Sequence, residues 1–186
     1  MNDYDDFPHS SSKKMKFKAK FLSSRDRYDV AFEAHPKNRD FHCAHCHHFV
    51  SAHPLLSGVN NRNHCPYCLW SRHLDLDQAG DRLCACKGLM QPVGLTLKSS
   101  RKKYASRDAG ELMLVHACTE CGSVSINRIA ADDDSQKLLE VFEDSRFLFA
   151  GLEVRLQEAN IQMLQTGDSS LVYARIFGQV PTSIDV

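Results

Sequence analysis

The chain has 186 residues, 23 Lys and Arg balanced by 23 Asp and Glu, and a hydrophobic content of 42%. This length suits one compact domain, or a metal-stapled module with an appendage. A run of about 18 apolar residues, which a transmembrane helix needs, does not occur, so no membrane partner is expected. The first six residues are acidic and polar, unlike a signal peptide, which predicts a cytoplasmic location.

The charge is distributed unevenly along the chain. Residues 1–128 carry 19 Lys and Arg against 13 Asp and Glu, a net charge of +6, and residues 129–186 carry 4 against 10, a net charge of −6. This asymmetry is typical of a basic binding face with an acidic extension, although two solvated faces of unequal sign are an equally simple interpretation. Residues 1–40, with five lysines between positions 13 and 20 interleaved with Met15, Phe17 and Phe21, are expected to form a basic, flexible arm that either orders on RNA or stays solvated.

The middle of the chain has the pattern of β-strands. Val93, Leu95 and Leu97 alternate with smaller or polar residues, and apolar runs follow at 112–117 and 124–130. The basic segment 98–107 is expected to link the first two strands. The sequence therefore predicts three strands between residues 93 and 130.

From residue 134 onward the apolar positions recur at helical spacing. Leu138, Val141, Phe142 and Leu148 begin this pattern, and Gly151 is expected to mark a break between two helices. The acidic run 132–134 suits the start of a helix. The run 171–177 fits either a strand or a helix, and the pattern does not decide between them.

Eight cysteines in a cytoplasmic chain favour metal binding over disulfides, because the cytosol keeps thiols reduced. They form three Cys-x-x-Cys units and one Cys-x-Cys unit: Cys43/Cys46, Cys65/Cys68, Cys118/Cys121 and Cys84/Cys86. Eighteen residues separate the first two units, which is the spacing of a zinc ribbon. Two residues between thiolates make a tight turn that aims both sulfurs at one point.

These units predict two structural zinc ions. The first site takes Cys43, Cys46, Cys65 and Cys68. The second takes Cys86, Cys118 and Cys121, with Cys84 or His116 as the fourth ligand. Cys84 is preferred because thiolates are the softer ligands, and a crossed pairing of the units stays open.

An enzymatic function is not expected. Cys65-Pro66-Tyr67-Cys68 matches the tetrapeptide of a glutaredoxin active site, but that motif needs an apolar strand before it and a helix after it. The preceding residues 60–64 have the composition of a loop. The sequence offers no clear nucleophile–base pair, phosphate loop or carboxylate dyad, so a thiol redox enzyme is the least favoured alternative.

The run from Arg62 to Ser71 opens with Arg-Asn-His-Cys-Pro and resembles the bacterial RNHCP-domain family, which is named for these residues. Further blocks of the resemblance are Phe41-x-Cys43-x-x-Cys46, His73-Leu74-Asp75, Gly80-Asp81-Arg82, Cys86-Lys87-Gly88-Leu89-Met90-x-Pro92, His116-x-Cys118-x-x-Cys121-Gly122 and Asn127-Arg128-x-Ala130-x-Asp132-Asp133. The resemblance implies a zinc-ribbon-type domain of poorly defined function. Cys84 departs from the family pattern, which leaves the fourth ligand of the second site open.

The expected fold is a small α+β protein. A basic arm (1–40) precedes a β-rich, zinc-ribbon-like domain stapled by metal (41–134), and an acidic, mainly helical segment (135–186) follows it. The predicted function is that of a zinc-binding accessory protein that contacts structured RNA or the ribosome through basic loops. The residues expected to contact RNA are Arg62, Lys98, Arg101, Lys102, Lys103, Tyr104 and Arg107. The alternative is a protein–protein adaptor that binds through residues 135–186.

Overall fold

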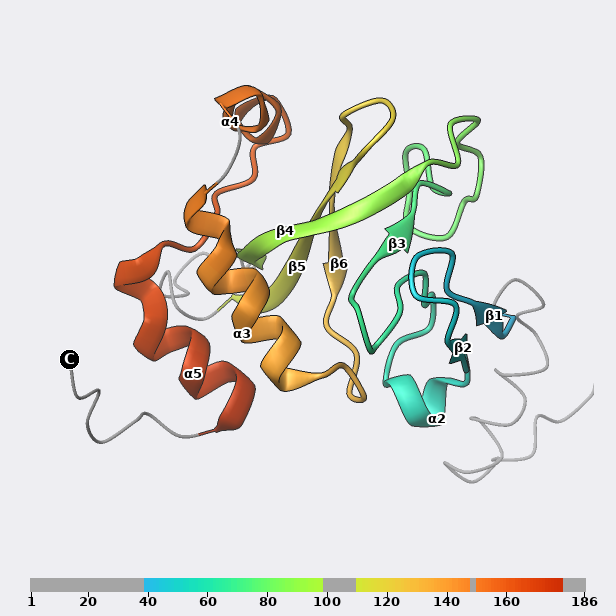
Figure 1. Ribbon diagram of the computed structural model, residues 1–186, viewed down its shortest axis with the longest axis horizontal. Helices are drawn as coiled ribbons and strands as arrows, with labels where there is room; N and C mark the ends of the chain where they lie inside the picture. Colours follow the sequence, from blue (N-terminus) through green and yellow to red (C-terminus); the bar gives the residue numbers. More distant parts are fainter. Residues whose placement is uncertain (1–38, 99–109, 148–149, 179–186) are drawn as a thin grey trace, which may run out of the picture. The chain divides into compact units, whose positions relative to one another are not determined.

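The computed structural model describes residues 39–98, 110–147 and 150–178 (Figure 1). Residues 1–38 of the predicted arm (1–40) and the basic residues of the segment 99–109 lie outside them. Within the described residues, none of the helices has the length and apolar character needed to cross a bilayer. The elements in chain order are β1 (Phe41–His42), β2 (Phe49–Val50), α2 (Pro54–Ser57), β3 (Ser71–Arg72), β4 (Leu89–Lys98), β5 (Glu111–Cys118), β6 (Val124–Arg128), α3 (Ser135–Asp144), the 3-10 turn η2 (Ser145–Phe147), α4 (Ala150–Glu158), the 3-10 turn η3 (Thr166–Asp168) and α5 (Ser169–Phe177).

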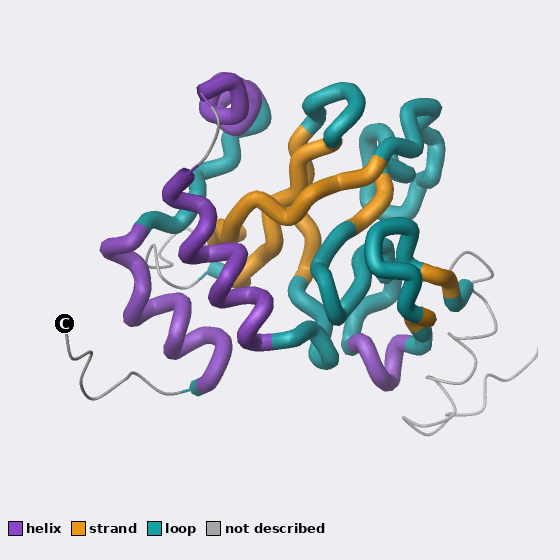
Figure 2. Tube along the Cα trace, viewed as in Figure 1, coloured by secondary structure: helices purple, strands orange, loops and turns teal. Residues whose placement is uncertain are grey.

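The strands form two antiparallel sheets. The short strands β1 and β2 pair with each other, and a four-stranded sheet has the order β3-β4-β5-β6. The three predicted strands are confirmed as β4, β5 and β6, and the predicted α+β class is confirmed as well. Figure 2 shows that long loops make up much of the chain around β1, β2 and β3.

Successive side chains of a strand point to opposite faces of the sheet, and β5 uses both faces. Leu114 lies in the larger apolar cluster, with side chains of β4, α3 and α5. Val115, the next residue, lies in a second cluster with Leu152 and Leu156 of α4. Helices therefore cover both faces of the sheet, α3 and α5 on one and α4 on the other (Figure 1).

A β-bulge explains how β4 serves both clusters. The register between β4 and β5 shifts between Pro92 and Gly94. Leu95 packs in the α3–α5 cluster, whereas Val93, two residues earlier, packs in the α4 cluster. A regular strand would place these two side chains on the same face, so the extra residue turns Val93 toward α4.

The segment after α4 completes the sheet beside β4. Met163 forms an isolated bridge with Thr96, and the Leu164 amide donates to the Leu95 carbonyl at 2.8 Å. A Cβ atom at Gly94 would lie 2.1 Å from the Met163 Cε atom, so this approach uses the absence of a side chain. Residues 169–177 are helical (α5), which settles the choice that the sequence left open.

Helix α3 packs against the four-stranded sheet. The Asp134 carboxylate accepts from the Gln136 and Lys137 amides at 2.9 and 3.1 Å, which makes it the N-cap. This bears out the prediction that the acidic run starts a helix. Leu138 and Phe142 of α3 are buried against the sheet in the larger cluster. Residues on both sides of position 134 therefore share one core.

Candidate metal centres

The first group of ligand atoms comes from two short loops. The sulfurs of Cys43 and Cys46 face those of Cys65 and Cys68, and the four atoms lie within 4.8 Å of one another. The Cys43 sulfur lies 3.6 Å from that of Cys68, and the Cys46 sulfur lies 3.5 Å from that of Cys65. We call this group site one. It consists of the four cysteines that the sequence assigned to it.

Each Cys-x-x-Cys unit adopts the same hairpin turn, or zinc knuckle. The amide of the first cysteine donates to the carbonyl two residues beyond the second cysteine, with distances of 2.9, 2.9 and 2.8 Å at Cys43, Cys65 and Cys118. The residue that follows the second cysteine has a positive φ in every case: 64° at His47, 61° at Leu69 and 71° at Gly122. Glycine adopts this conformation without steric cost at Gly122, whereas the other two knuckles impose it on larger residues, which is unusual for L-amino acids.

The second group of ligand atoms, site two, uses a knuckle that is split in the sequence. It consists of His73, Cys86, Cys118 and Cys121, again within 4.8 Å of one another. The His73 amide donates to the Gly88 carbonyl at 2.9 Å, and Gly88 lies two residues beyond Cys86. His73 thus takes the place of the first cysteine of a knuckle, and residues 74–85 form a loop inserted between the two ligands.

The two residues that the sequence offered as fourth ligand lie elsewhere. Cys84 is buried outside both groups of ligand atoms, and its amide donates to the Leu74 carbonyl at 2.9 Å. The His116 ring donates from Nε2 to the Leu69 carbonyl at 2.7 Å and accepts at Nδ1 from the Asn127 amide at 2.9 Å. Burial, helped by His64, lowers the pKa of His116 to about 3, so the ring is neutral. His73 is therefore the ligand that sequence reasoning missed.

A clue to His73 was present in the sequence. Cys86 is followed by Lys87, Gly88 and a strand, like the second half of a knuckle, but Leu83 stands where a first cysteine would be. Lys87 has a φ of 51°, as expected at this position of a knuckle. The first ligand of that knuckle had to come from another part of the chain.

Both groups fit a tetrahedral zinc ion. With Zn–S bonds of about 2.3 Å, neighbouring sulfurs of a tetrahedron lie about 3.8 Å apart, whereas a disulfide bond is only about 2.0 Å long. The separations of 3.5 and 3.6 Å in site one, and of 3.7 Å between Cys86 and Cys118 in site two, agree with the tetrahedron. In site two, His73 Nδ1 lies 3.3 Å from the Cys121 sulfur. The donor sets, four thiolates and three thiolates with one imidazole, are those of structural zinc sites, and the two groups are compatible with two zinc ions.

The environments of the sulfurs differ. Burial raises the pKa of Cys65 to about 11, and it raises that of Cys68 as well. Hydrogen bonds from Ser123 lower the pKa of Cys121 to about 6. In site one, Cys43 and Cys65 are buried and the other two cysteines are half-buried, whereas in site two only Cys118 is buried. Site two is therefore the more accessible metal centre.

Arg62 and His64 lock the second knuckle of site one to the start of α3. Arg62, whose side chain is fully buried, donates to Asp132 at 2.7 Å and to Asp133 at 3.3 Å. The His64 Nε2 atom lies 2.9 Å from the carboxylate of Asp133, which also accepts from the Ala130 amide at 2.7 Å. We call Arg62, His64 and Asp133 the clasp.

The neighbouring residues strengthen this connection. The carbonyl of Pro66 accepts from the Asp134 amide at 3.0 Å, and the carbonyl of Asn63 accepts from the Ser71 hydroxyl at 2.8 Å. Every residue of the Arg-Asn-His-Cys-Pro run thus has a structural contact. The run joins the metal knuckle to the helix that packs on the sheet.

The clasp corrects one of the predicted RNA contacts. Arg62 is paired with carboxylates inside the protein and cannot reach a phosphate, because its side chain is fully buried. Lys98 is exposed at the end of β4. The remaining predicted contacts lie outside the described residues: Arg101, Lys102, Lys103, Tyr104 and Arg107.

The glutaredoxin-like tetrapeptide lies in a different context from a redox site. Cys65 and Cys68 both belong to site one. Cys68 is followed by Leu69, Trp70 and strand β3, not by a helix whose N-terminus would stabilise a thiolate.

Comparison with known proteins identifies one family. The family model of the RNHCP domain matches residues 38–139. This match covers more than half of the chain and includes both metal sites and the clasp. No curated protein and no solved structure matches the chain. The chain belongs to the RNHCP-domain family.

Proposed function

We propose that this member of the RNHCP-domain family is a zinc-binding accessory protein that contacts structured RNA, such as ribosomal RNA. The observation that carries the proposal is a segment free of carboxylates around site one. Residues 41–74 contain no Asp or Glu, but seven histidines and two arginines, of which Arg72 is exposed and Arg62 is buried in the clasp. Asp40, at the border of this segment, is engaged by the Ala52 amide at 2.8 Å. RNA is a polyanion, and a segment without carboxylates of its own next to basic residues suits it.

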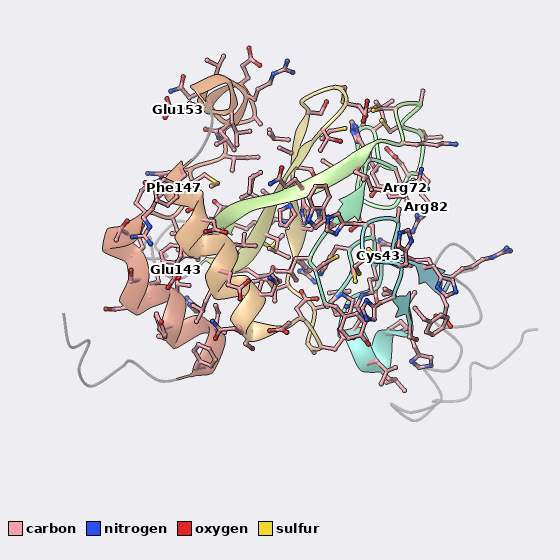
Figure 3. All side chains as sticks on the ribbon, in the orientation of Figure 1. Cys43, Arg72, Arg82, Glu143, Phe147 and Glu153 are labelled. Atoms are coloured by element: carbon pink, nitrogen blue, oxygen red, sulfur yellow. The ribbon has the colours of Figure 1, made fainter. Side chains whose placement is uncertain are left out.

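Other charges support this proposal. Arg72 and Lys98 are exposed (Figure 3 labels the first), and Lys98 precedes the segment 99–109, which carries four more Lys and Arg. Two acidic residues of the loop 74–85, Asp75 and Asp81, accept hydrogen bonds from the loop's own backbone. The Asp81 carboxylate accepts from amides such as that of Gln78 at 2.9 Å, and these hydrogen bonds lower its pKa.

The test is binding of a labelled RNA stem-loop by fluorescence anisotropy over a range of salt concentrations. Each lysine that contacts a phosphate contributes a slope of about 0.7 to 0.9 to the dependence of log K on log salt. Lys102→Glu with Lys103→Glu is therefore expected to weaken binding and to lower the slope by roughly 1.4 to 1.8. The matched control reverses two charges in the acidic half, Lys137→Glu with Arg146→Glu, and should leave the slope unchanged.

Sedimentation of the protein from a native lysate extends this test to the ribosome. Migration with ribosomal particles that is sensitive to RNase and to salt, and is lost in the Lys102/Lys103 variant, supports the proposal. Binding of the stem-loop that is absent at low salt, or equal in both double variants, would contradict it.

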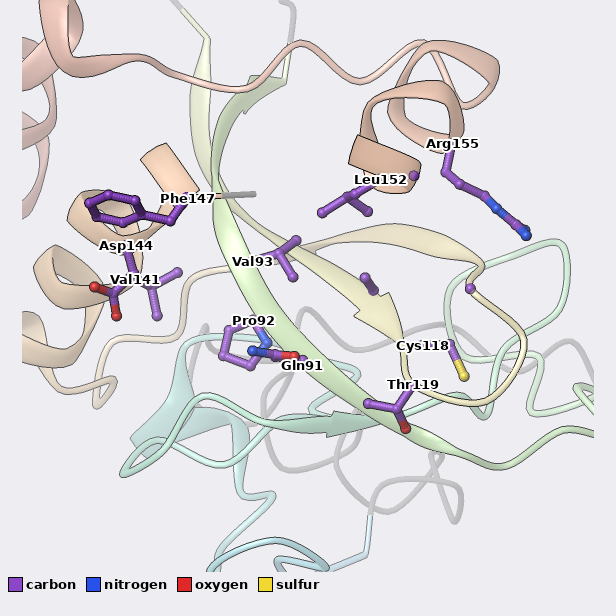
Figure 4. A pocket seen from close by; sticks show the side chains of 13 residues that line it. Gln91, Pro92, Val93, Cys118, Thr119, Val141, Asp144, Phe147, Leu152 and Arg155 are labelled. Atoms are coloured by element: carbon purple, nitrogen blue, oxygen red, sulfur yellow. The ribbon is translucent and has the colours of Figure 1, made fainter. Parts of the chain in front are cut away.

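A pocket on the helical side supports a second candidate, a protein–protein adaptor. It has a volume of about 490 Å³ and lies between β4, the end of β5, α3 and α4. Figure 4 shows Val93, Leu152 and Phe147 around it, with Arg155 toward one end. Phe147 is 80% exposed and Val154 of α4 is 56% exposed. Large exposed apolar side chains beside a pocket are typical of protein interaction sites.

The two candidates can be separated by a surface variant. Deleting residues 135–186 would be uninformative, because Leu138 and Val172 belong to the core. Phe147→Asp leaves the core intact and should abolish recovery of a protein partner in a pull-down while RNA binding stays at the wild-type level. Loss of stem-loop binding in Phe147→Asp would contradict both candidates as stated, because RNA would then bind on the helical side and not through the basic segment 99–109.

A further inference from the structure

Aromatic side chains are exposed on and beside the knuckles of site one. Phe49 of β2 is 56% exposed and Tyr67, inside the second knuckle, is 54% exposed. Phenyl and phenol rings are usually buried in a domain, because they are among the largest apolar surfaces that a chain can remove from water. Apolar cores lie close to both residues, but neither ring enters them.

Each exposed ring lies against a histidine. The rings of Phe49 and His42 meet edge to face with centroids 5.7 Å apart, and the rings of Tyr67 and His48 are tilted with centroids 4.9 Å apart. A third pair, His45 and Trp70, is stacked at 4.1 Å with an interplanar angle of 2°. Two of these pairs join the first knuckle to the second, since His45 and His48 belong to one and Tyr67 and Trp70 to the region of the other.

Site one fixes the backbone that carries these rings or adjoins them. Residues 43–48 and 65–70 are knuckles closed by backbone hydrogen bonds, and four sulfurs from them meet in site one. Figure 3 labels Cys43 in this part of the fold. Rings that are fixed before binding lose little conformational entropy when a ligand stacks on them.

The charge around the rings limits what that ligand can be. The rings lie within the carboxylate-free segment 41–74, whose exposed residues include His42, His45, His47 and His48. An acid-rich protein partner would suit the charge but would not require planar rings. Unpaired nucleobases offer planar faces on an anionic backbone, and aromatic and histidine side chains stack on them.

We propose that Phe49 and Tyr67 form a stacking surface for unpaired bases of RNA, supported by His42 and His48. This inference rests on the proposed function and makes it specific: phosphates contact the basic segments, and the knuckles of site one read single-stranded positions such as the loop of a stem-loop. Stacking of this kind tolerates any base, because every base has an aromatic face.

The experiment compares two labelled single-stranded oligoribonucleotides of equal length, one intact and one with several abasic nucleotides, using the full chain loaded with zinc. Both probes carry the same phosphates, so only stacking separates them. The intact probe should bind more tightly to the wild-type protein. Phe49→Ala and Tyr67→Ala should each weaken its binding by roughly 5- to 100-fold and leave the abasic probe almost unaffected.

Matched variants show whether an aromatic ring is what matters. Phe147→Ala removes a phenyl ring that is 80% exposed on the helical side and should change nothing. Phe49→Leu keeps an apolar side chain and should still lose affinity, whereas Tyr67→Phe keeps the ring and should retain it. Zinc content and the far-ultraviolet circular dichroism of each variant verify the fold.

The failures of the two proposals are distinguishable. Equal binding of the intact and abasic probes, or wild-type affinity in both alanine variants, overturns the stacking surface but leaves a phosphate-based RNA contact standing. Absence of binding to both single-stranded probes and to the stem-loop overturns the proposed function and the stacking surface together. Weakened binding to the intact probe alone, in both alanine variants and not in Phe147→Ala, supports the stacking surface.

Discussion

Replacing the central carboxylate of the clasp tests how the metal knuckle is held to the sheet. The Asp133 side chain is fully buried and accepts from three donors: Arg62 at 3.3 Å, His64 at 2.9 Å and the Ala130 amide at 2.7 Å. Asp133→Asn keeps the shape of the side chain but removes its charge and turns one acceptor into a donor. At least one of the three donors then faces an amide NH₂ group without an acceptor.

The expected cost follows from the burial of the pair. Removing one partner of a buried ion pair costs about 3–5 kcal/mol, because the other charge stays in a site of low dielectric constant. Asp132 continues to pair with Arg62 at 2.7 Å, which lowers the penalty. We therefore expect Asp133→Asn to lose about 3 kcal/mol of the free energy of unfolding, near the lower end of that range.

Asp132→Asn is the matched control. Asp132 binds the same guanidinium, but its side chain is 38% exposed, so water replaces part of the lost interaction. The expected loss is at most about 1 kcal/mol. Equilibrium unfolding in urea at a fixed excess of zinc, followed by the fluorescence of Trp70, measures both variants. Equal losses, or a loss below about 1 kcal/mol for Asp133→Asn, would refute the assignment of the clasp.

Three other substitutions and a control test the metal sites and the backbone. His73→Ala should lower the zinc content from two ions per chain to about one, whereas Cys84→Ser should keep both ions. Elemental analysis of the purified proteins measures the zinc content. Two ions per chain in His73→Ala would contradict the split knuckle. Gly122 has a φ of 71°, so Gly122→Ala should lose about 1–2 kcal/mol in urea unfolding. Gly151 in α4 has open space around it, so its replacement by Ala is the control and should be neutral or stabilising by about 0.5–1 kcal/mol. If Gly151→Ala lost as much free energy of unfolding as Gly122→Ala, backbone strain at the knuckle would not explain the effect.

The sequence predicts those parts of this protein whose cause is local. A Cys-x-x-Cys unit determines its own turn, so the three continuous knuckles could be recognised from spacing alone. Alternating apolar residues predicted β4, and the acidic run before Ser135 predicted the N-cap of α3, because capping needs only a side-chain oxygen close in sequence to the first free amides.

Features that depend on contacts distant in sequence were not predictable. The ligands His73 and Cys86 become neighbours only when β3 pairs with β4, which brings the ends of the loop 74–85 together. Arginine is usually a surface residue, so the sequence did not indicate that Arg62 is buried. Its burial depends on pairing with carboxylates some 70 residues later in the chain. Val93 changes face through a bulge that the alternation of apolar residues does not reveal.

The region around site one and the four-stranded sheet depend on metal to different degrees. The apolar cluster around site one consists of Cys43, Val50 and Cys65, with Phe41 and the two remaining ligands at its edge. Most of its members are the ligands themselves, and β1 and β2 have two residues each. Such a small core cannot offset the conformational entropy of its loops, so zinc must supply the folding free energy there. The four-stranded sheet, in contrast, has apolar clusters with helices on both faces.

Removal of zinc should therefore unfold the chain in parts. With a strong chelator, the amides of residues 43–70 are expected to exchange with deuterium rapidly, while those of Leu114 and Val115 in the centre of β5 stay protected. The buried clasp limits this independence, because Arg62 and His64 leave the core together with site one. Asp133 then keeps only the Ala130 amide as a donor. Protection in β5 should fall, by an amount comparable to the loss in Asp133→Asn, but should not vanish. Mass spectrometry after pulsed exchange measures both regions at once, and complete loss of protection in β5 would mean that the sheet also needs the metal.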